Sequence, residues 1–211
     1  PRGAIDPQAN GIVEHSLRVG CIVVATGFRP FEPRDSRYRK WAALPGVITS
    51  TALEQQLALQ EAIRGRLTPQ PEHPEPRNIA FILCVGSREE EGNRYCSRIC
   101  CPTALKQALE LKALLPEARI RIYYRDLRTI KPQWEDLYSQ AREAGVLFLR
   151  GRVTEVAAGS RGRVAINAEN ELFGRPSVDL VDLAVLAVGM VPGHGAALRQ
   201  VLKLPVGPDG F

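Results

Sequence analysis

Residues 78–101 read NIAFILCVGSREEEGNRYCSRICC, and this stretch holds the features that decide the fold. Residues 79–83 form a continuous apolar run, which is typical of a strand buried on both faces of a parallel sheet. The turn that follows carries Cys84 where a nucleotide-binding fold has its glycine-rich loop. Four of the five cysteines lie between Cys84 and Cys101, in the spacing C-x11-C-x3-C-C. The sequence therefore predicts thiol chemistry at the carboxyl end of this strand.

Helical and strand patterns alternate after this stretch. We expect a helix over 102–115, a strand over 120–124, a helix over 134–144, a strand over 146–149, antiparallel strands over 152–156 and 163–166, and a last apolar strand over 183–188. The first connections are too long for hairpins, so the order predicts a right-handed parallel core. The predicted fold class is α/β, with a Rossmann-like parallel sheet and an antiparallel β-hairpin or meander insertion.

The first 75 residues contain too few regular elements for a domain of their own. Residues 19–25 predict one strand, with Cys21 as a small buried side chain inside it. A short helix capped at Ser50 or Thr51 is expected to follow. Residues 68–77 hold four prolines and predict a linker. We interpret this part as the end of a larger unit.

Composition excludes several classes of function. The net charge of +5 comes from 28 basic and 23 acidic residues that are scattered along the chain, so a nucleic-acid partner is not indicated. No apolar stretch approaches the ~18 residues of a membrane span, and no signal peptide is recognisable. We expect a reducing cytoplasm, where clustered cysteines indicate metal or redox chemistry. His15, His73 and His194 are separated, so a Ser-His-Asp hydrolase is not predicted.

Clustered thiolates are soft ligands that select zinc, copper(I) or iron–sulfur clusters. Three interpretations remain open: a [4Fe–4S] cluster, a structural zinc in a docking module, and a redox dithiol. A helix that begins near Tyr95 would place two of the thiols one turn apart on one face. The helix N-terminus, Arg94 and Arg98 would favour the thiolate form. The candidate ligands are Cys84, Cys96, Cys100 and Cys101.

The same turn is a weak match to a dinucleotide site. Only Gly86 remains of the glycine pattern, although Ser87 and Arg88 could hold a pyrophosphate. Arg125 and Arg128 lie at the tip of the next strand, where related NADPH-dependent flavoproteins grip the 2′-phosphate. The competing interpretation is that these arginines are solvated or paired with acids such as Asp126 and Glu135. An NAD(P)H-binding domain of a disulfide oxidoreductase is thus an alternative function.

Three segments resemble the family of heterodisulfide reductase A subunits. The specific one is the cysteine segment with the helix start that follows it, residues 84–108. The segments ATGFRP (25–30) and AVGMVP (187–192) also match, and many flavoproteins with two dinucleotide domains share them. The resemblance covers nearly the whole chain.

This resemblance implies a cytoplasmic flavoprotein subunit that passes electrons between FAD and iron–sulfur clusters, in methanogens within a flavin-based bifurcating complex. It implies that the four cysteines hold a [4Fe–4S] cluster and that Thr26 and Gly27 lie beside the flavin. The implied partners are other redox subunits and ferredoxin-like electron carriers.

The chain departs from the family in lacking the FAD-binding G-x-G-x-x-G unit, the later flavin-contacting elements and the ferredoxin-type cysteine repeats. We therefore expect a central fragment that is inactive alone and belongs to a larger oxidoreductase, with an N-terminal remnant of the flavin domain. The expected division is 1–75 for the end of the FAD-domain segment and the linker, 76–192 for the nucleotide fold with the cysteines, and 193–211 for a return toward the flavin domain.

Overall fold

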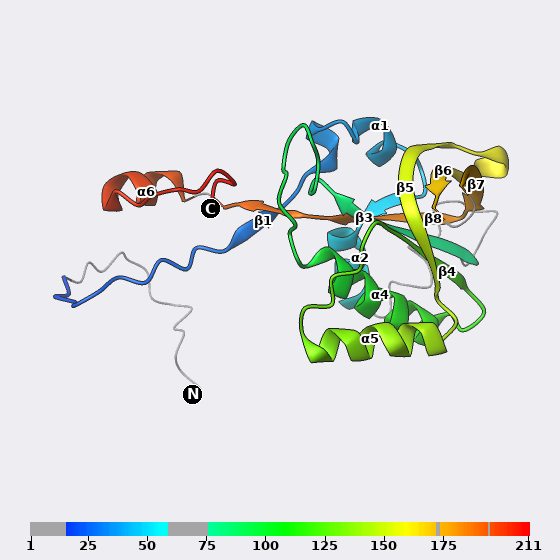
Figure 1. Ribbon diagram of the computed structural model, residues 1–211, viewed down its shortest axis with the longest axis horizontal. Coiled ribbons are helices and arrows are strands. Elements are labelled where there is room, and N and C mark those ends of the chain that lie inside the picture. The colour runs from blue at the N-terminus through cyan, green and yellow to red at the C-terminus, as the bar shows by residue number, and fades with distance from the viewer. Residues whose placement is uncertain (1–15, 59–75, 172–173, 194) are drawn as a thin grey trace, which may run out of the picture.

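The computed structural model describes residues 16–58, 76–171, 174–193 and 195–211. They form a seven-stranded sheet and a two-stranded ribbon (Figure 1). The strands of the sheet, in spatial order, are β2 (Val47–Thr49), β8 (Leu183–Val188), β3 (Asn78–Val85), β4 (Arg119–Tyr124), β5 (Leu147–Ala158), β6 (Val164–Asn170) and β7 (Arg175–Val181). Neighbours from β2 to β5 are parallel, and β5, β6 and β7 form an antiparallel meander. The predicted fold class is confirmed.

The parallel half follows the predicted alternation. Helix α4 (Cys100–Leu114) connects β3 to β4, and α5 (Pro132–Glu143) connects β4 to β5. Every residue of β8 and all but the first of β3 are buried, as expected for strands at the centre of a covered sheet. The carboxyl ends of β3 and β4 therefore open at one edge, where parallel α/β sheets place their sites.

Different elements cover the two faces of the sheet (Figure 1). Ile79, Phe81 and Leu83 of β3 pack on the side of α4, α5 and α2 (Ser50–Ala58). The alternate residues Ala80 and Ile82 face the side of the meander and of α1 (Arg39–Ala42). Because successive side chains of a strand point to opposite faces, the continuous apolar run of β3 supplies both cores.

Three features differ from the sequence-based expectation. The strands expected at 146–149 and 152–156 are one strand, β5, which leaves the parallel sheet and continues into the meander. Strand β7 was not predicted, since its run RPSVDLV is short of apolar residues and contains a proline. Residues 47–58, inside the expected 1–75 segment, add β2 and α2 to the sheet of the 76–192 unit.

The ribbon consists of β1 (Phe28–Pro30) and β9 (Met190–Pro192), and it leads away from the sheet toward α6 (Ala196–Leu202) (Figure 1). The strand predicted over 19–25 is wrong, because these residues form no ladder and Cys21 is exposed rather than buried. A strand needs a hydrogen-bonding neighbour, and in the described ranges the ladder begins only at Phe28. The remaining short elements are the 3₁₀ turns η1 (Pro33–Asp35) and η3 (Ser160–Gly162).

The candidate linker at 68–77 lies mostly outside the described residues, as do His15, His73 and His194. Among the helices that are described, none is both long and apolar enough to cross a membrane.

Candidate functional site

The turn after β3 has an uncommon backbone conformation. Cys84, Gly86 and Arg88 have φ angles of 64°, 74° and 59°, in the left-handed region that side chains other than glycine rarely adopt. The Ser87 amide donates to the Cys84 carbonyl oxygen at 3.2 Å and closes the turn. A Cβ atom on Gly86 would lie 2.2 Å from the ring of Phe31, so this position has no room for a side chain. Such local strain is typical of functional sites.

Residues 88–95 form a loop that folds back on itself. The Arg88 amide donates to the Tyr95 carbonyl oxygen at 2.9 Å, and the Glu89 amide donates to the Asn93 carbonyl oxygen at 3.0 Å. The Asn93 side-chain amide donates to the Gly86 carbonyl oxygen at 3.0 Å. These bonds bring the far end of the loop, and with it Cys96, back beside the turn.

Helix α4 begins at Cys100 and not near Tyr95, so the expected one-turn spacing of Cys96 and Cys100 on one helix is wrong. The reason is local, because Arg98 has a φ of 61°, which an α-helix cannot accommodate. Cys96 therefore lies in the loop, while Cys100 and Cys101 form the first turn of α4. The helix N-cap, Ile99, offers no side-chain acceptor to the amides of this turn.

Three of the four thiols meet at this helix N-terminus. Cys84, Cys100 and Cys101 are 3%, 2% and 3% exposed, and the thiol of Cys100 is in hydrogen-bond contact with those of Cys84 and Cys101. Cys96 is half-buried and acts on Cys101 through its charge. The structure thus gathers the four cysteines that the sequence singled out, with Cys96 as the outermost.

Their thiols differ in acidity. The hydrogen bond with Cys100 and burial raise the pKa of Cys84 well above its usual value. The hydrogen bond with Cys101 and burial raise the pKa of Cys100 to about 11. The hydrogen bond from Cys100, together with one from the Arg128 backbone, lowers the pKa of Cys101. Cys101, in the first turn of α4, is therefore the thiol that ionises first.

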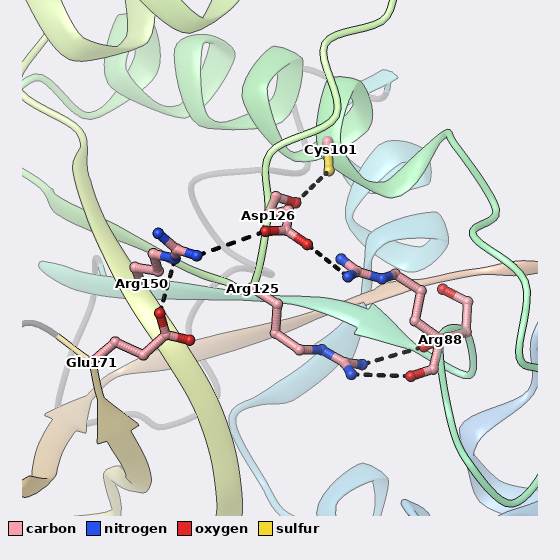
Figure 2. Close-up of polar contacts among 7 residues, drawn as sticks. Arg88, Cys101, Arg125, Asp126, Arg150 and Glu171 are labelled. Carbon is pink, nitrogen blue, oxygen red and sulfur yellow. Dashed lines mark hydrogen bonds and ion pairs between the residues drawn. The ribbon is translucent and has the colours of Figure 1, made fainter. Parts of the chain in front are cut away.

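Two arginines, Arg88 and Arg125, place positive charge at Cys84, and both lower the pKa of its thiol against the larger effects of Cys100 and burial. Arg125 does not reach into solvent to grip a phosphate. Its guanidinium donates to the Arg88 carbonyl oxygen at 3.0 Å and to the Ser87 carbonyl oxygen at 3.5 Å (Figure 2). The cations near the thiols are thus these two arginines rather than the expected Arg94 and Arg98, of which Arg94 binds the Glu90 carbonyl oxygen.

Asp126, in the loop after β4, joins several parts of the site (Figure 2). Its carboxylate pairs with Arg88 at 2.6 Å and with Arg150 at 3.9 Å, and Arg150 also pairs with Glu171 at 2.9 Å. Its backbone carbonyl oxygen lies 3.9 Å from the thiol of Cys101. Sequence reasoning had paired Asp126 with Arg125 or Arg128. Nothing in the sequence separates these candidates, because the true partner is 38 residues away.

A pocket of about 160 Å³ opens at the carboxyl ends of β3 and β4. Its lining includes Arg37, Tyr38, Tyr124, Arg125 and Glu89. Tyr38 donates a short hydrogen bond to Glu89, and burial followed by this bond raises the pKa of Tyr38. The pocket is therefore bordered by groups that already satisfy one another.

The expected pyrophosphate position is occupied by the loop itself. Ser87 is fully buried with a hydroxyl that has no hydrogen-bond partner among the described residues, and Gly86 lies under the ring of Phe31. The carbonyl oxygens of Ser87 and Arg88 point to Arg125, and oxygens would repel a phosphate. Arg128 is exposed on the loop before α5.

Gly189 connects the cysteine loop to the ribbon. Its amide donates to the Val85 carbonyl oxygen at 2.8 Å, and its own carbonyl oxygen accepts from the Phe31 amide at 2.9 Å. The Met190 amide donates to the Ser97 hydroxyl at 2.9 Å. The Tyr95 hydroxyl donates to the Met190 carbonyl oxygen at 2.8 Å. Sequence reasoning missed these positioning groups, whose partners lie more than 90 residues apart.

Thr26 and Gly27 lie at the far part of the ribbon, away from the cysteine turn. A Cβ atom on Gly193 would lie 3.5 Å from the carbonyl oxygen of each, and one on Gly195 would lie 3.5 Å from the Thr26 hydroxyl. Both expected flavin-side residues are exposed, and Gly27 has a φ of 70°. The structure therefore brings the two family-like segments 25–30 and 187–192 together, as the pairing of β1 with β9.

The thiols fit an iron–sulfur or other soft-metal site by their chemistry and by their gathering at one buried turn. In the described part of the chain, no group of three or more His, Cys, Asp or Glu side chains is arranged so that it could hold a metal ion as it stands. The thiols of Cys84, Cys100 and Cys101 instead hydrogen bond to one another. Binding would replace these contacts by bonds from the deprotonated sulfurs.

Comparison with known proteins identifies the relatives. The A subunit of a ferredoxin/F(420)H(2)-dependent CoB-CoM heterodisulfide reductase from Methanosarcina acetivorans is 37% identical over 201 residues, which are 94% of this chain and 25% of the relative. The chain is homologous to part of the heterodisulfide reductase A subunit. One of two A-type iron-sulfur subunits named for CoB-CoM heterodisulfide reductase in Methanopyrus kandleri is 35% identical over 213 residues, covering 99% of this chain and 32% of the relative.

The resemblance to the A subunit inferred from the cysteine segment is thus confirmed, and the chain spans about a third or less of the length of these relatives. No protein-family model matches the chain. Among solved structures, thioredoxin reductase from T. acidophilum has a TM-score of 0.50 and 12% identity, over 88% of this chain and 48% of that one. At this identity the likeness shows the fold alone, and that fold is of the flavoprotein reductase type.

Proposed function

We propose that this segment of the A subunit holds a [4Fe–4S] cluster through Cys84, Cys96, Cys100 and Cys101. The observation that carries the proposal is the meeting of three buried thiols at the first turn of α4, with the fourth in the loop beside them. Four cysteines are the usual ligand set of such a cluster. The name of the Methanopyrus relative, which calls it an iron-sulfur subunit, supports the same assignment.

The chain's own residues would protect and position the cluster. The buried sulfurs of Cys84, Cys100 and Cys101 limit the access of water and oxygen. The amides of the first turn of α4 and the charges of Arg88 and Arg125 favour thiolates over thiols. When bound, the cluster supplies one-electron redox chemistry.

We propose further that the β1–β9 ribbon sets the distance between this site and a flavin held beside Thr26 and Gly27. The hydrogen bonds of Tyr95 and Ser97 to Met190 tie the cysteine loop to that ribbon. The whole protein would then be a flavoprotein oxidoreductase subunit that relays electrons between FAD and the clusters of partner subunits or ferredoxin-like carriers. The heterodisulfide reductase names of the relatives support this role.

The test is anaerobic reconstitution of the chain followed by measurement of iron, sulfide and zinc per chain. We expect about four irons and four sulfides. Cys100→Ser should lose most of this content, whereas Cys21→Ser should keep it, because Cys21 is exposed and separate from the cluster residues.

One zinc per chain without sulfide would contradict the proposal and favour the structural-zinc interpretation. A metal-free chain that binds NADPH tightly would favour a dinucleotide site.

A further inference from the structure

We propose that Arg88 raises the reduction potential of the cysteine site and that Asp126 opposes it, so that this one ion pair sets the potential. The inference rests on the proposed [4Fe–4S] cluster and deepens it. The pair lies between the turn that carries Cys84 and the loop after β4 (Figure 2).

The position of Arg88 is the decisive observation. Its Nη2 atom is 2.6 Å from the Asp126 carboxylate, and its side chain is 20% exposed while that of Asp126 is 47% exposed. Its Nη1 atom is buried and, among the described residues, has no hydrogen-bond partner. An unpaired buried guanidinium N–H is costly unless an acceptor arrives. The charge of Arg88 also acts on the thiol of Cys84, which places this N–H group toward the proposed ligand sulfur.

The electrostatic effect follows from the charge of the site. One-electron reduction adds a negative charge to the cluster and its four thiolates. A buried cation beside a ligand sulfur stabilises the reduced state and raises the potential. A nearby carboxylate destabilises the reduced state and lowers the potential. Arg88 is the more buried partner and contacts the cysteine turn directly, so its effect is the larger.

Breaking the ion pair from either side gives the experiment its discrimination. Arg88→Gln and Asp126→Asn remove the same 2.6 Å pair, so any merely structural effect should be similar in both. Their electrostatic effects have opposite signs. The reconstituted chain is poised with dithionite and mediators, which supply the electron, and the reduced fraction is followed by EPR.

We expect Arg88→Gln to lower the reduced-to-oxidised ratio at fixed potential about tenfold, which is about 59 mV for one electron. Asp126→Asn should raise the ratio, by less. Arg88→Lys keeps the charge and should stay near the wild type. The control, Arg119→Gln, removes an exposed charge at the opposite end of β4 and should leave the ratio unchanged.

Shifts of the same sign in both variants, or no shift, would overturn the inference while the cluster assignment stands. If Arg88→Gln binds no cluster, the Asp126→Asn variant decides: a raised ratio supports the inference and an unchanged or lowered ratio overturns it. A wild-type chain without iron and sulfide would overturn the proposed function, and the inference with it.

Discussion

Gly189→Ala places one methyl group at the junction between the cysteine loop and the ribbon. Its Cβ atom would lie 2.5 Å from the Ser97 hydroxyl, 3.1 Å from the Ser87 Cβ atom and 3.2 Å from the Gly86 carbonyl oxygen. Ser97 can turn away only by giving up the hydrogen bond from the Met190 amide, at a cost of about 1–3 kcal/mol. The other two contacts add about 1 kcal/mol of overpacking. We expect a loss of about 2–4 kcal/mol in the free energy of unfolding.

Urea unfolding followed by circular dichroism measures this loss. Gly193→Ala is the matched control, since neither glycine has a positive φ and the nearest atoms to a Cβ at 193 are 3.5 Å away. The control should change stability by less than about 0.5 kcal/mol. The alanine at 189 should also expose Cys96 to faster alkylation, because Ser97 moves with the loop. Equal stability and equal alkylation in the two variants would refute the packing argument.

Three further predictions concern individual bonds and thiols. Tyr95→Phe removes only the hydroxyl that binds the Met190 carbonyl oxygen, so it should cost about 1 kcal/mol in urea unfolding and shorten the lifetime of a reconstituted cluster in air; an unchanged lifetime would count against the tie between loop and ribbon. The metal-free chain should lose stability as the pH rises from about 9 to about 11, because the raised pKa of Cys100 keeps its thiol neutral in the folded state while the unfolded thiol ionises; thermal unfolding of Cys100→Ser should lack this part of the loss. Tyr123→Phe leaves the Asp179 carboxylate without the tyrosine hydroxyl and should destabilise the meander by about 1–3 kcal/mol, measured by urea unfolding, whereas an unaffected midpoint would mean that this bond contributes nothing.

The parallel core was predictable because its signals are local. The apolar run of β3 and the fully apolar β8 specify buried strands, and the helices between the strands begin and end near the expected residues. The meander was predicted only in part, since β7 has half-exposed positions and no run that a sequence pattern detects. The ribbon joins residues about 160 positions apart, so no local signal could have paired β1 with β9.

The cysteines themselves were found from their spacing, whereas their surroundings were not. The start of α4 depends on the left-handed backbone of Arg98, which a helical pattern does not reveal in an arginine. The choice of Arg88 rather than Arg125 as the partner of Asp126 depends on how the turn after β3 meets the loop after β4. Residue types thus predicted the thiol chemistry, and the tertiary structure determines which charges act on it.

The most direct test of the cluster assignment is a low-temperature EPR spectrum of the anaerobically reconstituted chain after reduction with dithionite. We expect the signal of a reduced [4Fe–4S] cluster, retained in Cys21→Ser and lost in Cys84→Ser. A chain that takes up zinc and gives no such signal, or one whose signal survives the loss of Cys84, would contradict the assignment.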